Sequence, residues 1–249
     1  MNLSYQLYSS RSETDLNAVL AHLAATGYTQ VEGFGGVFGD PAGLRKEMDR
    51  LGLTMPSAHF DLGMLESNLD KALSVAMTLG IDTLYAPYLA EDERPADVAG
   101  WQAFADRLSA LGTKVRAAGF SFGWHNHDFE FVTLEDGSTP MEIILERVPE
   151  LEWEADIAWV VRGKADAVAW IEKYASRITS VHIKDIAPEG ENTDEDGWAD
   201  VGEGTVPWAE LLTTLSAAPV RTFVMEHDKP ADTRRFAERS FTNVQKMGG

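Results

Sequence analysis

Residues 151–185, LEWEADIAWVVRGKADAVAWIEKYASRITSVHIKD, contain the pattern that decides the fold. Residues 151–156 and 178–183, near its two ends, are short apolar or β-branched runs, and residues 165–174 between them have helical spacing. A strand, a helix and a second strand in this order form one βα unit, in which the two strands lie parallel. The segment therefore predicts a parallel sheet covered by helices.

The same alternation runs along the whole chain and gives eight candidate strands, each followed by a helical stretch such as residues 96–118. We expect strands at residues 5–8, 30–33, 54–59, 83–86, 121–125, 151–156, 178–183 and 222–226. Eight such units in 249 residues match one (β/α)8 TIM barrel, an α/β fold, so we expect a single domain over residues 1–249. A doubly wound open sheet usually carries a glycine-rich turn after its first strand, and residues 7–11, LYSSR, contain no glycine.

Composition excludes several kinds of site and partner. The chain has 40 acidic and 21 basic residues, a formal net charge of −19, so its field repels nucleic acid and anionic lipid surfaces. It contains no cysteine, which leaves oxygen and imidazole as metal ligands. Its first residues lack the features of a secretory signal, and no apolar run approaches the ~20 residues that cross a bilayer. We therefore expect a cytoplasmic protein without nucleic-acid or membrane partners.

Residues that can carry chemistry gather at the carboxyl ends of the predicted strands. Five of the six histidines lie there, namely His59, His125, His127, His182 and His227, together with the acids Glu32, Glu154, Asp156, Asp185, Glu226 and Asp228. These strand ends converge on one mouth of a barrel, where the active sites lie. Carboxylates crowded in a concave site repel one another unless a cation neutralises them. We therefore predict one divalent metal at the mouth, Mn, Mg, Co or Zn.

The period-two alternation of a strand indicates which of these residues share a face. Residues two apart point to the same side, so at least one member of each pair can face the mouth. The pairs are His125 with His127, Glu154 with Asp156, His182 with Lys184, and Glu226 with Asp228.

Four motifs in order resemble those of a known family: GWHNHDFEF at residues 123–131, DIAWV at 156–160, VHIKD at 181–185 and VMEHD at 224–228. The set resembles the sugar phosphate isomerase/epimerase group of the xylose isomerase-like TIM barrels, in the AP endonuclease 2 superfamily. The VGEG turn at residues 201–204 and YQLY at residues 5–8 extend the resemblance over essentially the whole chain.

The resemblance implies a metal site. It identifies Asp156, His182 and Glu226 as ligands. The fourth ligand in much of this group is a glutamate at the end of the fifth strand, where this chain has His125. Glu130, a few residues further on, is preferred as the missing carboxylate ligand, with His125 as the alternative.

The resemblance also implies contacts with the substrate. His59 and Glu32 are expected to contact substrate hydroxyls or to support the ligands. Lys184 and Asp185 form either an ion pair or a substrate contact, and Trp159 either stacks on a sugar ring or plugs the barrel rim.

The reaction implied is the isomerisation or epimerisation of a keto sugar or related polyol, which removes a proton beside a carbonyl and passes through an enediolate. Glu226 acts on one side of the substrate, and Glu130, His125 or His127 on the other. The substrate is expected to lack a phosphate, because Arg11, Arg162, Lys164 and Lys184 are the few cations near the mouth. Dimers or tetramers are common in the family, so a homo-oligomer is compatible with the resemblance.

Three alternatives remain open on sequence alone. A histidine in place of the usual glutamate favours elimination instead, as in the inosose dehydratases and 3-keto-glycoside lyases of related barrels. An endonuclease that acts at abasic sites shares the barrel, but the charge of −19 opposes it. A non-catalytic carbohydrate-binding barrel is the third.

Overall fold

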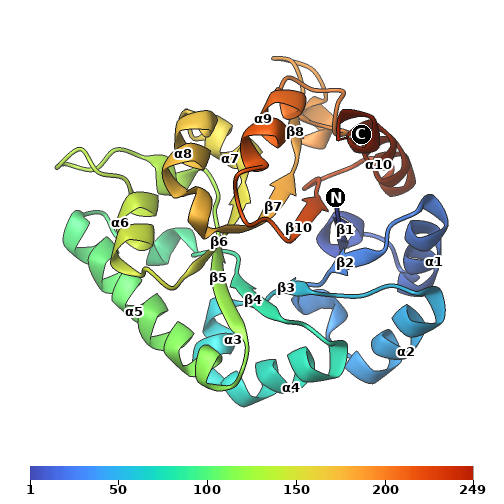
Figure 1. The fold of residues 1–249 in the computed structure, drawn as a ribbon, viewed down its shortest axis with the longest axis horizontal. Helices are drawn as coiled ribbons and strands as arrows, with labels where there is room; N and C mark the ends of the chain where they lie inside the picture. The colour runs from blue at the N-terminus through green and yellow to red at the C-terminus, as the bar shows by residue number, and fades with distance from the viewer. Residues whose placement is uncertain (249) are drawn as a thin grey trace.

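The computed structural model describes residues 1–248 and shows an eight-stranded parallel sheet curved into a barrel (Figure 1). The strand order is β2-β1-β10-β7-β6-β5-β4-β3, and every pair of neighbours in it is parallel. The barrel strands are β1 (Leu3–Gln6), β2 (Gln30–Glu32), β3 (Ser57–His59), β4 (Thr83–Ala86), β5 (Ser121–His125), β6 (Glu152–Asp156), β7 (Ile178–Ile183) and β10 (Thr222–Met225). The predicted (β/α)8 barrel is confirmed.

The barrel closes, by a few contacts, between the two end strands of the sheet, β2 and β3. The amide of His59 donates to the carbonyl of Gly33 over 2.8 Å. Single parallel bridges join Gln30 to Thr54 and Gly33 to Ala58. Because the sheet curves round to meet itself, the carboxyl ends of all eight strands share one mouth.

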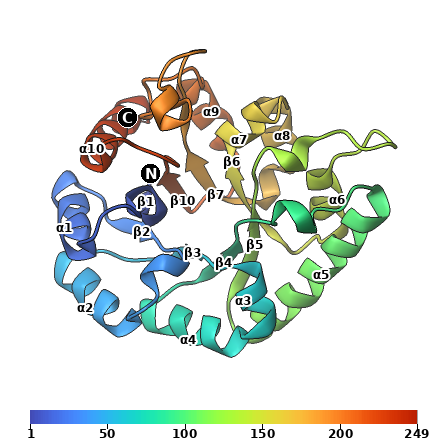
Figure 2. The same cartoon turned by 180° about the vertical axis from the view of Figure 1, so that it is seen from behind.

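Helices surround the barrel on all sides (Figures 1 and 2). The α-helices are α1 (Leu16–Thr26), α2 (Pro41–Leu51), α3 (Leu62–Ser67), α4 (Leu69–Leu79), α5 (Val98–Ala117), α6 (Pro140–Arg147), α7 (Ile157–Arg162), α8 (Ala167–Tyr174), α9 (Trp208–Leu215) and α10 (Thr233–Met247). Short 3-10 helices are η1 (Leu7–Ser10), η2 (Gly35–Val37), η3 (Glu91–Glu93), η4 (Phe129–Phe131), η5 (Ala175–Arg177) and η6 (Thr193–Glu195). None of the helices within residues 1–248 is long and apolar enough to cross a membrane.

Aspartates begin many of these helices. The side chains of Asp15, Asp40, Asp61, Asp97, Asp166 and Asp232 each accept a hydrogen bond from a backbone amide in the first turn of a helix. Each cap of this kind contributes about 1 kcal/mol, and its negative charge also favours the helix N-terminus. Part of the acidic excess of the chain therefore stabilises the outer ring of helices.

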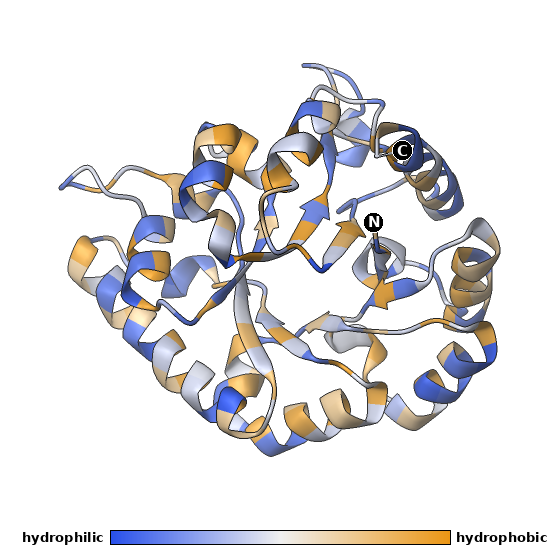
Figure 3. Cartoon of the chain, in the orientation of Figure 1, coloured by the Kyte–Doolittle hydropathy of each residue, from blue (hydrophilic) through white to orange (hydrophobic). Residues whose placement is uncertain are grey.

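Side chains of the strands alternate between the interior of the barrel and the layer under the helices. Trp124 on β5 points outward and packs edge-on against Phe104 of α5, with ring centroids 5.3 Å apart. Its neighbours Gly123 and His125 therefore point inward. Figure 3 shows orange, hydrophobic segments on the strands and much blue on outer helices such as α2 and α10.

The structure departs from the predicted elements at two places near the mouth. The first strand ends at Gln6 rather than at residue 8, because the Gln6 side chain accepts a hydrogen bond from the Tyr8 amide (3.1 Å) and begins the 3-10 helix η1. After β7, where the sequence predicts no strand, β8 (Asp185–Ile186) and β9 (Trp198–Ala199) form a small antiparallel hairpin. Two-residue strands have no periodicity that a sequence pattern can detect.

We expect Gly123→Ala to destabilise the barrel. A Cβ at this position would lie 2.7 Å from the backbone carbonyl oxygen of Glu152 and would also clash with the ring of Tyr85. Because a strand backbone cannot move aside easily, the free energy of unfolding should fall by about 1–3 kcal/mol in urea denaturation. Gly39→Ala is the matched control, since a Cβ there meets no atom within 4 Å. Equal stability of the two variants would contradict tight packing at Gly123.

Candidate functional site

A cavity of about 580 Å³ opens at the mouth of the barrel. Its lining includes polar side chains from the strand ends, among them His59, His125 and Glu226, and aromatic residues from the loops beyond them. The predicted position of the site, at the carboxyl ends of the strands, is therefore where the structure has a cavity.

Four buried side chains beside this cavity could hold a metal ion: His125, Asp156, His182 and Glu226. Each offers one ligand atom, and these atoms all lie within 4.8 Å of one another. Asp156 Oδ2 accepts no hydrogen bond, and the charged group beside it is the ammonium of Lys184 at 3.1 Å. Two imidazoles and two carboxylates form a donor set that suits divalent transition metals.

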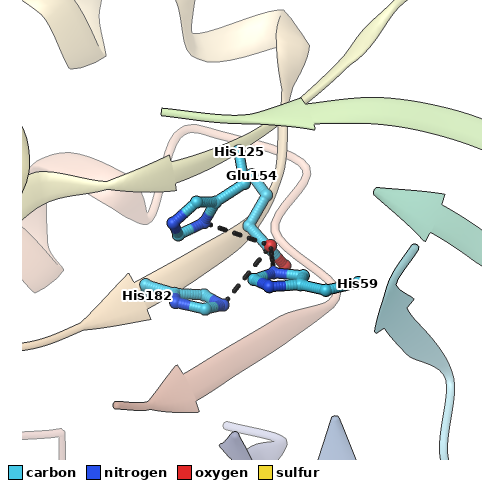
Figure 4. A group of neighbouring side chains, drawn as sticks. All are labelled: His59, His125, Glu154 and His182. Carbon is cyan, nitrogen blue, oxygen red and sulfur yellow. Dashed lines mark hydrogen bonds and ion pairs between the residues drawn. The ribbon is translucent and has the colours of Figure 1, made fainter. Parts of the chain in front are cut away.

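A second group lies against the first and shares two of its histidines. In Figure 4 the imidazoles of His59, His125 and His182 point toward one carboxylate oxygen of Glu154. The distances to Glu154 Oε2 are 2.6 Å from His59 Nε2, 3.3 Å from His125 Nδ1 and 3.3 Å from His182 Nε2. The sequence analysis places Glu154 at the mouth and on one face with Asp156, but it assigns this carboxylate no part in binding the metal or the substrate.

Glu32 lies beneath the cavity, among the buried side chains of the barrel interior. Its carboxylate accepts hydrogen bonds from His182 Nε2 (2.7 Å), Gln6 Nε2 (2.8 Å) and the Ser57 hydroxyl. His182 Nδ1 donates on its other side to Glu226 Oε2 (2.8 Å). Of the two roles expected for Glu32, the structure places it where it supports His182, not where a substrate hydroxyl would reach it.

Lys184 is fully buried with its ammonium group among three carboxylates. Its Nζ lies 3.1 Å from Asp156 Oδ2, 3.0 Å from Glu226 Oε2 and 3.0 Å from Asp228 Oδ2. Burial alone would lower the pKa of Lys184, but the three carboxylates outweigh burial and raise the pKa above its ordinary value. The side chain therefore stays charged and acts as a fixed cation.

The same charges set the pKa values of the neighbouring groups. Burial raises the pKa of Asp156 to about 6, against the opposing effect of Lys184. For Glu226 burial is outweighed by Lys184 and His182, which hold the pKa well below its usual range. Burial and the neighbouring charge of His182 lower the pKa of His125 to about 3, so its ring is neutral. Burial alone would lower the pKa of His182 as well, but the surrounding glutamates outweigh burial and raise this pKa well above its ordinary value, so a metal that binds His182 would displace a proton from its ring.

Glu130 does not join either group. Its Oε1 accepts a hydrogen bond from Trp124 Nε1 (2.9 Å) and its Oε2 accepts one from the His127 amide (2.9 Å). Because Trp124 points outward under α5, Glu130 follows it into the outer layer, and burial there raises the pKa of Glu130 to about 8. The sequence preference for Glu130 over His125 as a ligand is therefore opposite to the arrangement in the structure.

His127 and Trp159 line the wall of the cavity. The ring of His127 lies between those of Tyr88 and Trp159, with centroid distances of 5.1 Å and 5.2 Å, and its Nδ1 is buried without a hydrogen-bond partner. Burial lowers the pKa of His127 well below its ordinary value, so the imidazole is neutral and can accept a proton.

Asp185 organises a loop and does not line the cavity. Its Oδ1 accepts hydrogen bonds from the amides of Ile186 (2.9 Å) and Val206 (3.0 Å), and its Oδ2 from those of Gly202 (2.9 Å) and Gly204 (3.1 Å). Both roles that the sequence predicts for Asp185, an ion pair with Lys184 and a substrate contact, are replaced by these four bonds. The reason is that the carboxylate faces the backbone of the VGEG turn.

Comparisons with known proteins agree with this architecture. The family model described as the xylose isomerase-like TIM barrel matches residues 20–240. Inosose dehydratase from Salmonella typhimurium is 24% identical over 197 residues, which cover 71% of this chain but only 65% of that protein. A sugar phosphate isomerase/epimerase from Parabacteroides distasonis has a TM-score of 0.81 at 23% identity, over 98% of this chain and 93% of that chain. The IOLI protein, solved with a bound zinc atom, has a TM-score of 0.78 at 13% identity, over 99% and 98% of the two chains.

We expect Asp185→Asn to destabilise the protein by about 1–3 kcal/mol, because the new amide group would face two backbone N–H donors and leave them without acceptors. Asp194→Asn makes the same change of charge at an exposed position in the same connection and should leave stability unchanged. Urea denaturation of both variants measures the difference. Unchanged stability of Asp185→Asn would mean that the loop does not depend on this carboxylate.

Proposed function

The chain belongs to the xylose isomerase-like TIM barrel family, and we propose that it is a metal-dependent enzyme that isomerises or epimerises an unphosphorylated keto sugar or related polyol. The observation that supports this proposal most directly is the group of His125, Asp156, His182 and Glu226 beside the cavity. Lys184 gives Asp156 and Glu226 one positive charge, and a divalent cation would offset the remaining negative charge of the buried carboxylates around them. The zinc atom of the IOLI protein, which has the same fold, is a further support.

The proposed metal ligands are Asp156, His182, Glu226 and, in place of the usual glutamate, His125. With two imidazoles in the set, Zn, Co or Mn suits the site better than Mg. When bound, such a cation supplies positive charge that polarises the substrate carbonyl and stabilises negative charge on adjacent oxygens.

Two further carboxylates would orient the ligand imidazoles. Metal-binding histidines usually direct their other ring nitrogen to a carboxylate, which fixes the tautomer and the angle of the ring. Glu32 lies 2.7 Å from His182 Nε2, and Glu154 lies 3.3 Å from His125 Nδ1. His59 contacts both of these carboxylates, at 3.5 Å from Glu32 and 2.6 Å from Glu154, and holds the two together.

Proton transfer is assigned to two groups on the cavity wall. Glu226, which Lys184 keeps ionised, accepts the proton beside the substrate carbonyl from one side. In isomerisation Glu226 then gives this proton to the neighbouring carbon, while His127, which is neutral and has a free ring nitrogen, takes the proton of a substrate hydroxyl and passes it to the former carbonyl oxygen. Lys184 thereby acts as a positioning residue, and Glu130 holds the backbone of His127 in place.

A second candidate reaction is the elimination of water from an inosose or of the substituent from a 3-keto-glycoside. Its support is that the curated relatives with sequence similarity are inosose dehydratases. Both reactions begin with removal of the proton beside a carbonyl, so both use the same Glu226. They diverge afterwards, when the proton held by Glu226 goes either to a neighbouring carbon of the substrate or to a departing oxygen.

We expect His125→Ala to lose its metal and Glu130→Gln to keep it. The parent protein should hold about one equivalent of metal after dialysis, and removal of one of four ligands should reduce this to a small fraction. Elemental analysis gives the result without any substrate. His125→Glu restores the usual ligand type and should retain metal. Loss of metal from Glu130→Gln, with retention in His125→Ala, would reverse the assignment.

The proposed reaction is tested by incubating the parent protein with keto sugars and inososes in deuterated water. We expect deuterium to enter the carbon beside the carbonyl, and Glu226→Gln to reduce this exchange by at least ~10²-fold. Mass spectrometry then separates the two candidates, since isomerisation conserves the mass of the substrate apart from the label and elimination lowers it. A metal-loaded protein that exchanges no proton on any of these compounds would exclude both.

A further inference from the structure

The cavity has two parts of different chemistry. Its polar part contains His59, His125, Glu226 and Asp228, beside the proposed metal ligands. The other part is aromatic, formed by Tyr8 and Phe34 and by Tyr88, Trp159 and Trp198. A sugar bound through its hydroxyl and carbonyl oxygens occupies the first part, so the second part needs a ligand group of its own.

The aromatic residues form two groups on different sides of the mouth. Tyr8 and Phe34 follow β1 and β2, and their rings pack edge-on with centroids 5.3 Å apart. Trp159 and Trp198 pack edge-on at 4.9 Å, and the ring of His127 joins Trp159 to Tyr88, which follows β4. In the strand order, β3 on one side and β10 on the other separate these groups, because Trp198 lies in the connection that follows β7. A ligand ring can therefore be contacted from two sides.

Two of these aromatic rings are exposed to an unusual degree. Tyr8 is 37% exposed and Tyr88 is 47% exposed, and no other aromatic residue within residues 1–248 is among the exposed large hydrophobic side chains. Exposed apolar surface concentrated at a cavity marks a binding site more often than a solvated face. The two tyrosines gain burial only when a ligand covers them.

The volume of the cavity exceeds what a single sugar ring fills. About 580 Å³ corresponds to roughly 20 water molecules at ~30 Å³ each, and lies in the range of about 300–1,000 Å³ that takes a drug-sized ligand. A monosaccharide at the polar part would leave much of this volume to water. A second ring attached to the sugar would displace that water from the aromatic surface.

The charges at the cavity exclude an anionic second group. The carboxylates of Asp61, Asp196, Glu226 and Asp228 line it, against the single guanidinium of Arg162. Arg162 lies 3.2 Å from the ring centroid of Trp198, and its Nη2 donates to the carbonyl of Asp196 over 2.8 Å. The other cations near these carboxylates are also paired, Lys184 with Glu226 and Asp228 and Lys229 with Asp196 (3.0 Å), so a phosphate or nucleotide would meet no unpaired cation among the lining residues.

From these observations we propose that the substrate is a keto glycoside: a keto sugar that carries an uncharged aromatic ring, with the sugar at the polar part and the ring among the aromatic side chains. The proposal rests on the proposed function for the chemistry at the sugar. It adds a second subsite, which selects the group that is linked to the sugar. This subsite is formed by Tyr8, Phe34, Tyr88, Trp159 and Trp198.

The test compares the binding of phenyl β-D-glucopyranoside and methyl β-D-glucopyranoside to the purified protein by isothermal titration calorimetry. These probes share the sugar and differ only in the second group. We expect the phenyl glycoside to bind about tenfold more tightly or better, from stacking on two aromatic groups. Equal affinity, or no binding of either probe at millimolar concentration, overturns the proposal.

Variants of the two exposed tyrosines then test which side chains cause the tighter binding of the phenyl glycoside. Tyr88→Ala and Tyr8→Ala should each reduce the preference for the phenyl glycoside by about threefold or more, with little effect on the methyl glycoside. Tyr88→Phe keeps the ring and should keep the preference. Met77→Ala on α4 is the control, because Met77 is 67% exposed and does not line the cavity. A uniform loss of affinity for both probes in the tyrosine variants contradicts the proposal.

A third probe and the exchange experiment separate the remaining outcomes. Tighter binding of cellobiose than of the phenyl glycoside would replace the aromatic ring by a second sugar and overturn the proposal as stated. Tighter binding of the phenyl glycoside without any deuterium exchange would contradict the proposed function and still support the aromatic subsite. Deuterium exchange without tighter binding of the phenyl glycoside would support the proposed function and contradict the aromatic subsite.

Discussion

The structure of the mouth depends on the burial of one positive charge, that of Lys184, among three carboxylates. A buried ion costs several kcal/mol unless it is paired with good geometry, and here Asp156, Glu226 and Asp228 lie at 3.0–3.1 Å from the ammonium group. These partners come from β6 and from the end of β10, and Lys184 follows β7. The ion cluster therefore joins three strand ends and also keeps the carboxylates of the proposed metal site ionised.

The side chain of Asp156 has both a structural role and a role in the proposed metal site. Its Oδ1 accepts a hydrogen bond from the Trp159 amide (3.0 Å) and caps α7, while its Oδ2 faces Lys184 and the cluster. On the opposite side Asn126 accepts the Asp156 amide (3.0 Å) and donates to its carbonyl (3.0 Å). A ligand whose backbone and side chain are both held this way keeps one rotamer, which is what a preorganised metal site requires.

The strand pattern of the sequence is sufficient for the fold and for the general position of the site, because strand and helix periods are local properties. Residues 83–86, 121–125 and 178–183 were predicted with the bounds that the structure shows. Alternation along strands is equally local, and it brought Glu154 with Asp156 and Glu226 with Asp228 to shared faces. These patterns predicted polar residues at the strand ends that line the cavity, such as His59, His125 and Glu226, but not loop residues that also line it, such as Tyr88 and Trp198.

The sequence could not predict in which direction a side chain points when it lies beyond the end of a strand. Glu130 and His125 lie five residues apart, and the outward indole of Trp124 decides between them, because it holds the Glu130 carboxylate in the outer layer. The Asp185 carboxylate likewise accepts hydrogen bonds from backbone amides about 20 residues further on, and no local sequence pattern reveals this contact. The sequence thus determined the barrel and the polar residues at the ends of its strands. The tertiary structure decided which of them face one another, since their partners come from distant segments.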